Sequence, residues 1–511
     1  MSMMKKLAAM MLALALVLTC SVSALACTSI YVGSSLTEDG TAYFARSEDI
    51  GNSYNKIFYV SPAGNHRAGD AYTGCYGFSY TFGKDSYAYT AFRDDNLSGE
   101  CPDCGGTHEH TPYEAGGTNE MGVSMTATVS IYPNEAIEDA DPFLETGIEE
   151  AEIVTVVLSQ ADSAKDGVDI LTGIYDEFGM CGGSSIIIAD QSEAWYLENC
   201  SGTQYIAMKL PSDMIFVNPN MSLVGLMDLD DGNVIASEGL IETAVEAGTF
   251  VGDEAENQID FRASYSEDYM DPRMKNCLAY VNAGYHYTDE SLTNEDFCMS
   301  NVKDGGVMPL YNNIEADRAF TLEDLMDYYK VDLVARDRNL DIHIFQLDAA
   351  AAPELDTVEW VAMDDGAYTV YVPYYPMLTT ETYEGYQVGG VPAEFSAEEP
   401  AGDAPCYPTT TWDGEEGFMV LPEDWADSVY WSFDAVSNYV LHVDESQQQT
   451  VKDAYAALQE DIFAEFDDMK TEAAGAKDMK ELAKDMTVAS AAIAEGAHKT
   501  AVDLYKTISE K

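Results

Sequence analysis

Residues 27–51 read CTSIYVGSSLTEDGTAYFARSEDIG, and they carry the clearest strand and turn signals of the chain. Residues 28–34 alternate in polarity as a half-buried strand does, and Thr41 to Ala45 form a second run of that kind. Asp39-Gly40, between the two runs, is a turn signal. The stretch therefore predicts a β-hairpin that begins at a cysteine.

The register of this hairpin follows from its turn. A turn centred near residue 38 pairs residues whose numbers sum to about 76, which places Asp49 opposite Cys27 and Arg46 opposite Ile30. Strand partners lie about 5 Å apart, so both polar groups are expected near the thiol. Arg46 would lower the pKa of the Cys27 thiol. Asp49 would orient the α-ammonium that Cys27 carries if it is the first residue of the mature chain. An exposed Arg46–Asp49 ion pair is the alternative that the residues leave open.

Residues 1–26, upstream of the hairpin, resemble a signal peptide. Lys5 and Lys6 precede an apolar run from Leu7 to Leu18, and Ala24-Leu25-Ala26 forms an A-x-A cleavage site. The apolar run is shorter than the ~20 residues that a membrane-spanning helix needs. We therefore expect a secreted protein, extracellular or periplasmic, with no membrane span.

Cleavage after Ala26 would make Cys27 the first residue of the mature chain. An N-terminal cysteine carries a thiol and an α-amine, whose ordinary pKa is about 7.7–8.0. This amine can take the thiol proton, so a separate histidine is not required. The alternative is a non-enzymatic surface lipoprotein anchored at the same cysteine. Against it, position 24 is Ala rather than a larger aliphatic residue, and a strand begins at Thr28 with no tether.

Later blocks of sequence follow in an order that is typical of one family. They are Thr118-Asn119-Glu120-Met121-Gly122-Val123, Glu193-Ala194-Trp195-Tyr196-Leu197-Glu198, Asn218-Pro219-Asn220 ahead of Gly225, and Tyr371-Val372-Pro373-Tyr374-Tyr375. With the cysteine hairpin, they make the chain resemble the N-terminal-nucleophile cysteine dipeptidases of bacteria. These belong to the same superfamily as bile salt hydrolases and penicillin V acylases. The resemblance spans roughly residues 27–465.

The resemblance implies roles for particular residues. Cys27 would be the nucleophile and, through its amine, the base, and Arg46 and Asp49 match an Arg-x-x-Asp pair that positions it. An asparagine would complete the oxyanion hole by donating to the developing negative oxygen. Asn218 and Asn220 are both candidates for that asparagine. Arg273 is the nearest candidate for a second arginine of the family, and Asn119 is expected to be structural.

The resemblance also implies the activity: hydrolysis of dipeptides through a thioester on Cys27, without a metal or organic cofactor. A non-peptide amidase of the bile salt or penicillin acylase type is the alternative within the superfamily. A dipeptide brings a compact ammonium that needs a desolvated carboxylate or carbonyl partner, and Glu48 is one carboxylate near the thiol.

Strand patterns and helix patterns are mixed along the chain, which indicates an α+β fold. We expect helices over 145–178 and 233–248, a β-meander over 184–218 and strands over 340–375. The resemblance implies a four-layer αββα sandwich. The expected organisation is a signal peptide (1–26), a peptidase domain (27–445) and a C-terminal helical appendage (446–511), with Gly475 and Gly496 as helix breaks.

The composition excludes two classes of protein. The 511 residues include 25 Lys+Arg against 90 Asp+Glu, for a formal net charge of −65, so a general nucleic-acid binder is excluded. Hydrophobic residues make up 46%, enough for a packed core, so global disorder is excluded. A homo-oligomer is neither required nor excluded.

A second cluster of candidate ligands lies in one short segment. Cys101 and Cys104 are followed by His108 and His110, a set that predicts either a small disulfide loop or a structural zinc site. Eight cysteines besides Cys20 and Cys27 make an even number, which suits disulfides. His343 lies in an alternating strand and is expected in the core rather than as a base.

Overall fold

The computed structural model describes residues 27–49, 55–74, 77–95, 113–129, 131–288, 290–389, 393–401, 404–411 and 414–509. The signal-peptide prediction (1–26) and the Cys101, Cys104, His108 and His110 segment lie outside these residues. Within the described part, no helix combines the length and the apolar composition that a bilayer span requires.

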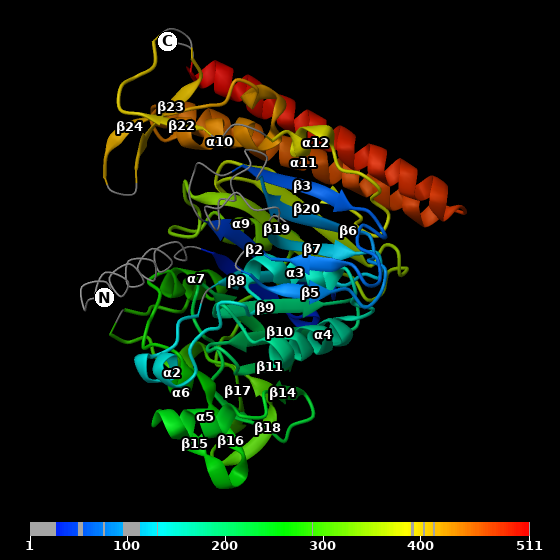
Figure 1. Ribbon diagram of the computed structural model, residues 1–511. Coiled ribbons are helices and arrows are strands. Elements are labelled where there is room, and N and C mark those ends of the chain that lie inside the picture. Colours follow the sequence, from blue (N-terminus) through cyan, green and yellow to red (C-terminus); the bar gives the residue numbers. More distant parts are fainter. Residues whose placement is uncertain are drawn as a thin grey trace, which may run out of the picture.

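Two antiparallel sheets form the centre of the molecule (Figure 1). The six-stranded sheet has the order β12 (Ile215–Asn218), β1 (Thr28–Val32), β2 (Ala42–Asp49), β19 (Asn339–Leu347), β20 (Thr357–Met363) and β21 (Val372–Tyr374). The eight-stranded sheet has the order β14 (Val234–Ala236), β11 (Tyr205–Leu210), β10 (Ala194–Asn199), β9 (Ser184–Ala189), β8 (Ser124–Val129), β7 (Glu114–Asn119), β6 (Tyr89–Asp94) and β3 (Lys56–Ser61).

Helices cover the outer faces of both sheets. α3 (Glu150–Leu158) and α4 (Ala164–Phe178) pack on the eight-stranded sheet. α10 (Val429–Val440), α11 (Glu445–Gly475) and α12 (Met479–Ser509) lie on the other side, where the long α11 and α12 run beside each other in Figure 1. Trp360 of β20 packs against Phe466 of α11 with ring centroids 4.8 Å apart. The expected αββα sandwich with a C-terminal helical segment is confirmed.

The remaining elements are short and join these layers. The helices are α2 (Glu135–Ala140), α5 (Leu240–Ala247), α6 (Phe261–Tyr265), α7 (Met274–Val281), α8 (Asn294–Phe297) and α9 (Leu322–Tyr328). The small sheets are β4 (Ala71–Thr73) with β5 (Ser79–Thr81); β13 (Leu226–Asp228), β16 (Gln258–Asp260) and β15 (Gly252–Asp253); β17 (Ser300–Lys303) with β18 (Gly306–Tyr311); and β22 (Glu394–Ser396), β24 (Glu416–Val420) and β23 (Cys406–Thr410).

Three helix predictions need new boundaries. The run 145–178 is two helices, because the Ser163 side chain accepts from the Asp166 N–H and starts α4 anew. The run 233–248 opens with strand β14, so only its second half is helical. In the C-terminal segment α11 ends at Gly475 as expected, whereas Gly496 lies inside α12 and breaks nothing.

The cysteine hairpin forms, but its register differs by one residue from the prediction. Ser29, not Ile30, lies opposite Arg46, and Thr28 lies opposite Ser47. Because side chains alternate along a strand, a one-residue shift exchanges the two faces. Arg46 therefore shares a face with Cys27, and Asp49 points to the other face with Thr28.

The even cysteine count does not reflect a full set of disulfides. Cys200, Cys277 and Cys298 are buried free thiols. They pack with the apolar residues of the core, as a small hydrophobic side chain does. The choice between a disulfide loop and a zinc site at Cys101 and Cys104 remains a prediction.

Candidate active site

Cys27 lies directly before β1, with β2 on one side and β12 on the other, and only 9% of the residue is exposed. Arg273 holds its main chain in place. One guanidinium nitrogen, Nη1, donates to the carbonyl oxygen of Cys27 at 3.0 Å and to the Thr28 hydroxyl at 2.9 Å. The other, Nη2, donates to the Pro219 carbonyl at 3.0 Å. Arg273 thus ties the start of β1 to the segment after β12.

The thiol itself faces Arg46. Nη2 of Arg46 lies 3.1 Å from Sγ of Cys27, and the same nitrogen lies 3.0 Å from the Tyr113 hydroxyl and 3.2 Å from Oε1 of Glu150. Its Nη1 donates to the Ala115 carbonyl at 3.2 Å. These contacts hold the guanidinium plane against the sulfur, where a positive charge favours a thiolate.

Burial nevertheless dominates the titration of this thiol. Burial raises the pKa of Cys27, Arg46 lowers it, and the carboxylates of Asp49, Glu150 and Glu48 raise it further. The net direction is upward, so the thiol is protonated at neutral pH. A thiol in this state needs a base to become a nucleophile.

Asp49 contacts a different set of groups. Its Oδ1 accepts from Nδ2 of Asn339 at 2.6 Å, and its Oδ2 lies 3.8 Å from Nη1 of Arg273. Burial raises the pKa of Asp49 to about 6. Arg46 and Asp49 therefore do not pair with each other as an exposed ion pair would. Asp49 lies near the Cys27 main chain through Arg273, while Arg46 contacts the sulfur.

Arg273 is itself fixed by a neighbouring carboxylate. Asp271 accepts from Nε of Arg273 through Oδ1 and from Nη2 through Oδ2, each at 2.9 Å. This bidentate pair fixes the plane of the guanidinium. Of these residues only Arg273 was predicted from the sequence; Asp271, Asn339, Tyr113 and Glu150 were not. The spacing Asp-x-Arg at 271–273 was the one local signal available for any of them.

The two asparagine candidates have different surroundings. Nδ2 of Asn218 donates to the Tyr196 hydroxyl at 2.8 Å and to Oγ of Ser185 at 3.2 Å, so both of its amide protons are used. Asn218 also lies opposite Ser29. β12 ends at Asn218, and Asn220 follows two residues later, directly after the Pro219 carbonyl that Arg273 binds together with Cys27. Asn220 is buried and has a left-handed backbone (φ 61°). We therefore favour Asn220 as the oxyanion-hole residue.

We expect Asn218→Ala to lower stability more than rate. The Asn218 side chain donates to the Tyr196 hydroxyl and accepts from the Met221 N–H. The change leaves both of these buried groups without this partner. The free energy of unfolding in urea should fall by about 2 kcal/mol. The matched variant is Asn220→Gly, because glycine tolerates the left-handed backbone. It should keep stability closer to wild type and lower kcat. The reverse pattern would assign the oxyanion hole to Asn218.

Glu48 and His343 belong to one buried network, which Lys56 and Asp341 join. Lys56 lies 2.7 Å from Glu48 and also pairs with Asp94. His343 contacts Asp341 at 2.9 Å through Nδ1 and the Thr126 hydroxyl at 2.9 Å through Nε2. Burial lowers the pKa of His343, so it is neutral. Its expected place in the core is confirmed.

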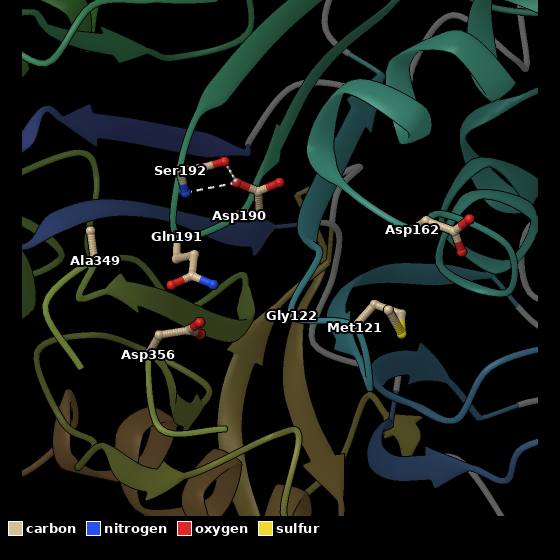
Figure 2. A pocket seen from close by; sticks show the side chains of 8 residues that line it. All are labelled: Met121, Gly122, Asp162, Asp190, Gln191, Ser192, Ala349 and Asp356. Carbon is tan, nitrogen blue, oxygen red and sulfur yellow. Dashed lines mark hydrogen bonds between the residues drawn. The ribbon is translucent and has the colours of Figure 1, made fainter. Parts of the chain in front are cut away.

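A cavity of about 420 Å³ lies away from the thiol (Figure 2). It is lined by Met121, Gly122, Asp162, Asp190, Gln191, Ser192, Ala349 and Asp356. β19 pairs with Asp49 at its first residue and with Ala42 at its last, so the loop carrying Ala349 and Asp356 lies at the far end of the sheet from Cys27. The Asp190 carboxylate accepts from the Ser192 N–H and hydroxyl. Within the described ranges, no group of three or more His, Cys, Asp or Glu side chains is arranged to hold a metal ion.

Comparison with known proteins gives one family. The model of peptidase family C69 matches residues 26–396. The probable dipeptidase B of Streptococcus pyogenes serotype M1 is 30% identical over 396 residues, which cover 71% of this chain and 74% of that protein. The probable dipeptidase of Salmonella dublin is 29% identical over 369 residues, covering 69% and 81%.

Solved structures match over a similar part of the chain. Penicillin V acylase from Agrobacterium tumefaciens has a TM-score of 0.30 and 12% identity, covering 68% of this chain and 85% of its own. A mutant of conjugated bile acid hydrolase from Clostridium perfringens has a TM-score of 0.31 and 11% identity, covering 66% and 89%.

Proposed function

The chain belongs to peptidase family C69, and on that premise we propose that it is an exported dipeptidase whose nucleophile is the thiol of Cys27. The mature N-terminus, once residues 1–26 are removed, supplies the α-amine that acts as the base. The relatives named probable dipeptidases support the substrate class.

The observation that carries this proposal is the arrangement around one sulfur. Arg46 faces Sγ at 3.1 Å, and Arg273 holds the Cys27 carbonyl oxygen at 3.0 Å. Burial raises the pKa of the Cys27 thiol, Arg46 lowers it, and no histidine is among the groups that shift it, so the thiol needs a base, which the α-amine of the same residue would supply. The nucleophile and the base are then attached to the same residue, which reduces the entropy lost in reaching the transition state.

The proposed reaction has two halves. The α-amine takes the Cys27 proton, and the sulfur attacks the scissile carbonyl carbon. Asn220 would donate to the resulting oxyanion. The ammonium of Cys27 then protonates the leaving amine, which departs as the C-terminal amino acid and leaves a thioester. In the second half the same amine deprotonates a water, which attacks the thioester and releases the N-terminal amino acid.

The position of Cys27 argues against a lipid anchor at this residue. A diacylglycerol group on Sγ would have to leave the protein, yet Cys27 is only 9% exposed and its sulfur faces the buried side chain of Arg46. The following residues enter a sheet at once, paired with a strand on each side. An anchor with this geometry would displace β1 from between β2 and β12.

We expect the mature protein to prefer dipeptides with a free amino terminus. The measurement is kcat/KM on a panel of free dipeptides, their N-acetylated forms, glycocholate and penicillin V. N-acetylation should remove most of the activity, and the last two compounds should be turned over negligibly. Efficient cleavage of glycocholate or penicillin V with dipeptides untouched would replace the dipeptidase by an amidase and keep the Cys27 mechanism.

A further inference from the structure

The ammonium of a bound dipeptide must lie close to the nucleophilic sulfur. In a near-attack geometry the carbonyl carbon is about 3–3.5 Å from the nucleophile. The α-nitrogen is two bonds from that carbon, a span of about 2.5 Å at standard bond lengths. The ammonium therefore lies within roughly 6 Å of Sγ of Cys27, and its counter-charge must be within a hydrogen bond of that region.

Three of the carboxylates near Cys27 are committed elsewhere. Glu48, the candidate from the sequence, is paired with the buried Lys56 at 2.7 Å. Asp271 is engaged by Arg273 through both of its oxygens. Asp49 points to the opposite face of β2 from the sulfur and accepts from Asn339. Each of the three thus already has a charged or hydrogen-bonding partner on the side away from the Arg46–Glu150 pair or within its own ion pair.

Glu150 is placed differently. Its Oε1 lies 3.2 Å from Nη2 of Arg46, and that nitrogen lies 3.1 Å from Sγ of Cys27. Sγ and Oε1 are therefore at most about 6.3 Å apart, the sum of those two distances. The Glu150 side chain is 10% exposed against 1% for Arg46. Of this pair, Glu150 is thus the more accessible to an incoming group.

Local structure holds this carboxylate still. Glu150 is the first residue of α3, which starts with a capping box formed by Glu149 and Glu152. The Tyr113 hydroxyl donates to Oε1 of Glu150 at 2.7 Å. A side chain fixed in this way loses little conformational entropy when it binds a ligand.

We propose that Glu150 is the specificity-determining residue that receives the α-ammonium of the substrate, which restricts the enzyme to peptides with a free amino terminus. This inference rests on the proposed dipeptidase function. The bound ammonium and the Arg46 guanidinium would share the Glu150 carboxylate between them. In the free enzyme Glu150 opposes ionisation of the thiol, so an ammonium at this carboxylate also removes an obstacle to thiolate formation.

The test compares two readouts in the mature enzyme and its Glu150→Gln variant. The first is kcat/KM for Ala-Ala and for propionyl-Ala, which lacks only the α-amine. The second is the rate at which iodoacetamide alkylates Cys27. Glutamine keeps the size and the hydrogen-bonding shape of the side chain and removes the charge. Glu145→Gln, an exposed position ahead of the same helix, is the matched control for loss of one surface charge.

We expect hydrolysis of the free dipeptide to fall while alkylation of Cys27 does not fall. Glu150→Gln should lower kcat/KM for Ala-Ala at least tenfold, chiefly through KM, and leave any turnover of propionyl-Ala unchanged or raised. Alkylation of Cys27 should stay equal or become faster, because a charge that disfavours the thiolate has gone. Glu145→Gln should change neither readout.

Other results separate the failure of this inference from the failure of the function. Parallel losses in hydrolysis of Ala-Ala and in alkylation would mean that Glu150 only supports Arg46 and the thiol. Unchanged hydrolysis of Ala-Ala would place the ammonium elsewhere. If wild-type enzyme with a confirmed free Cys27 cleaved no dipeptide at all, the dipeptidase proposal itself would be wrong.

Discussion

Cys27→Ala is expected to lower kcat/KM for dipeptides by more than about 10⁴-fold while the protein folds normally, since the variant has no group to form the thioester. Cys27→Ser should keep only a trace of activity, because a hydroxyl is far harder to ionise than a thiol. The measurement is dipeptide hydrolysis by protein whose mature N-terminus has been checked by intact mass. Thermal unfolding should match that of the wild type, since the alanine side chain fits the space of the thiol.

The control for this experiment keeps the thiol and blocks the amine. A chain with one unremoved Met ahead of Cys27 has an amide where the mature enzyme has an amine. It should be as inactive as Cys27→Ala, even though iodoacetamide still reaches the sulfur. Full activity in the blocked protein would exclude the N-terminal base, whatever the thiol does. A diacylglycerol adduct in the intact mass would instead support the lipoprotein alternative.

Arg46→Ala is expected to lower kcat/KM about a hundredfold, or ~2–3 kcal/mol of transition-state stabilisation. Arg46 is the group that lowers the pKa of Cys27, and the neighbouring carboxylates raise it. Without Arg46 the thiol pKa should rise further. The pH at which alkylation of Cys27 reaches half its maximal rate should therefore move upward.

Two controls separate this effect from a general loss of an ion pair. Arg46→Lys keeps a positive charge and should recover part of the rate, although it cannot reproduce the contacts of a planar guanidinium. Arg67 forms a salt bridge with Asp85 at the surface, where the two side chains are 65% and 56% exposed. Arg67→Ala breaks this salt bridge and should change neither the rate nor the stability appreciably. Kinetics unchanged by both Arg46→Ala and Asp49→Ala would remove Arg46 and Asp49 from the catalytic proposal.

Features that depend on neighbours along the chain could be predicted without the structure. The alternating run from Thr28, the Asp39-Gly40 turn and the second run from Thr41 predicted a hairpin starting at Cys27, and the hairpin forms. Local signals of this kind need no distant partner, because strand alternation and turn geometry are set by a few adjacent residues. The resemblance to a family then implied the αββα layers, which local patterns alone could not supply.

Tertiary structure decided which side chains face the sulfur. A shift of one residue in the hairpin register exchanged Arg46 and Asp49 between the two faces of β2, and a turn predicted only to within a residue cannot decide that. Arg273 reaches Cys27 from 246 positions away in the chain, and Glu150 reaches Arg46 from 104 positions away. Such contacts exist only when the two sheets and their helices pack, because burial and layer geometry, not spacing in the sequence, bring these charges together.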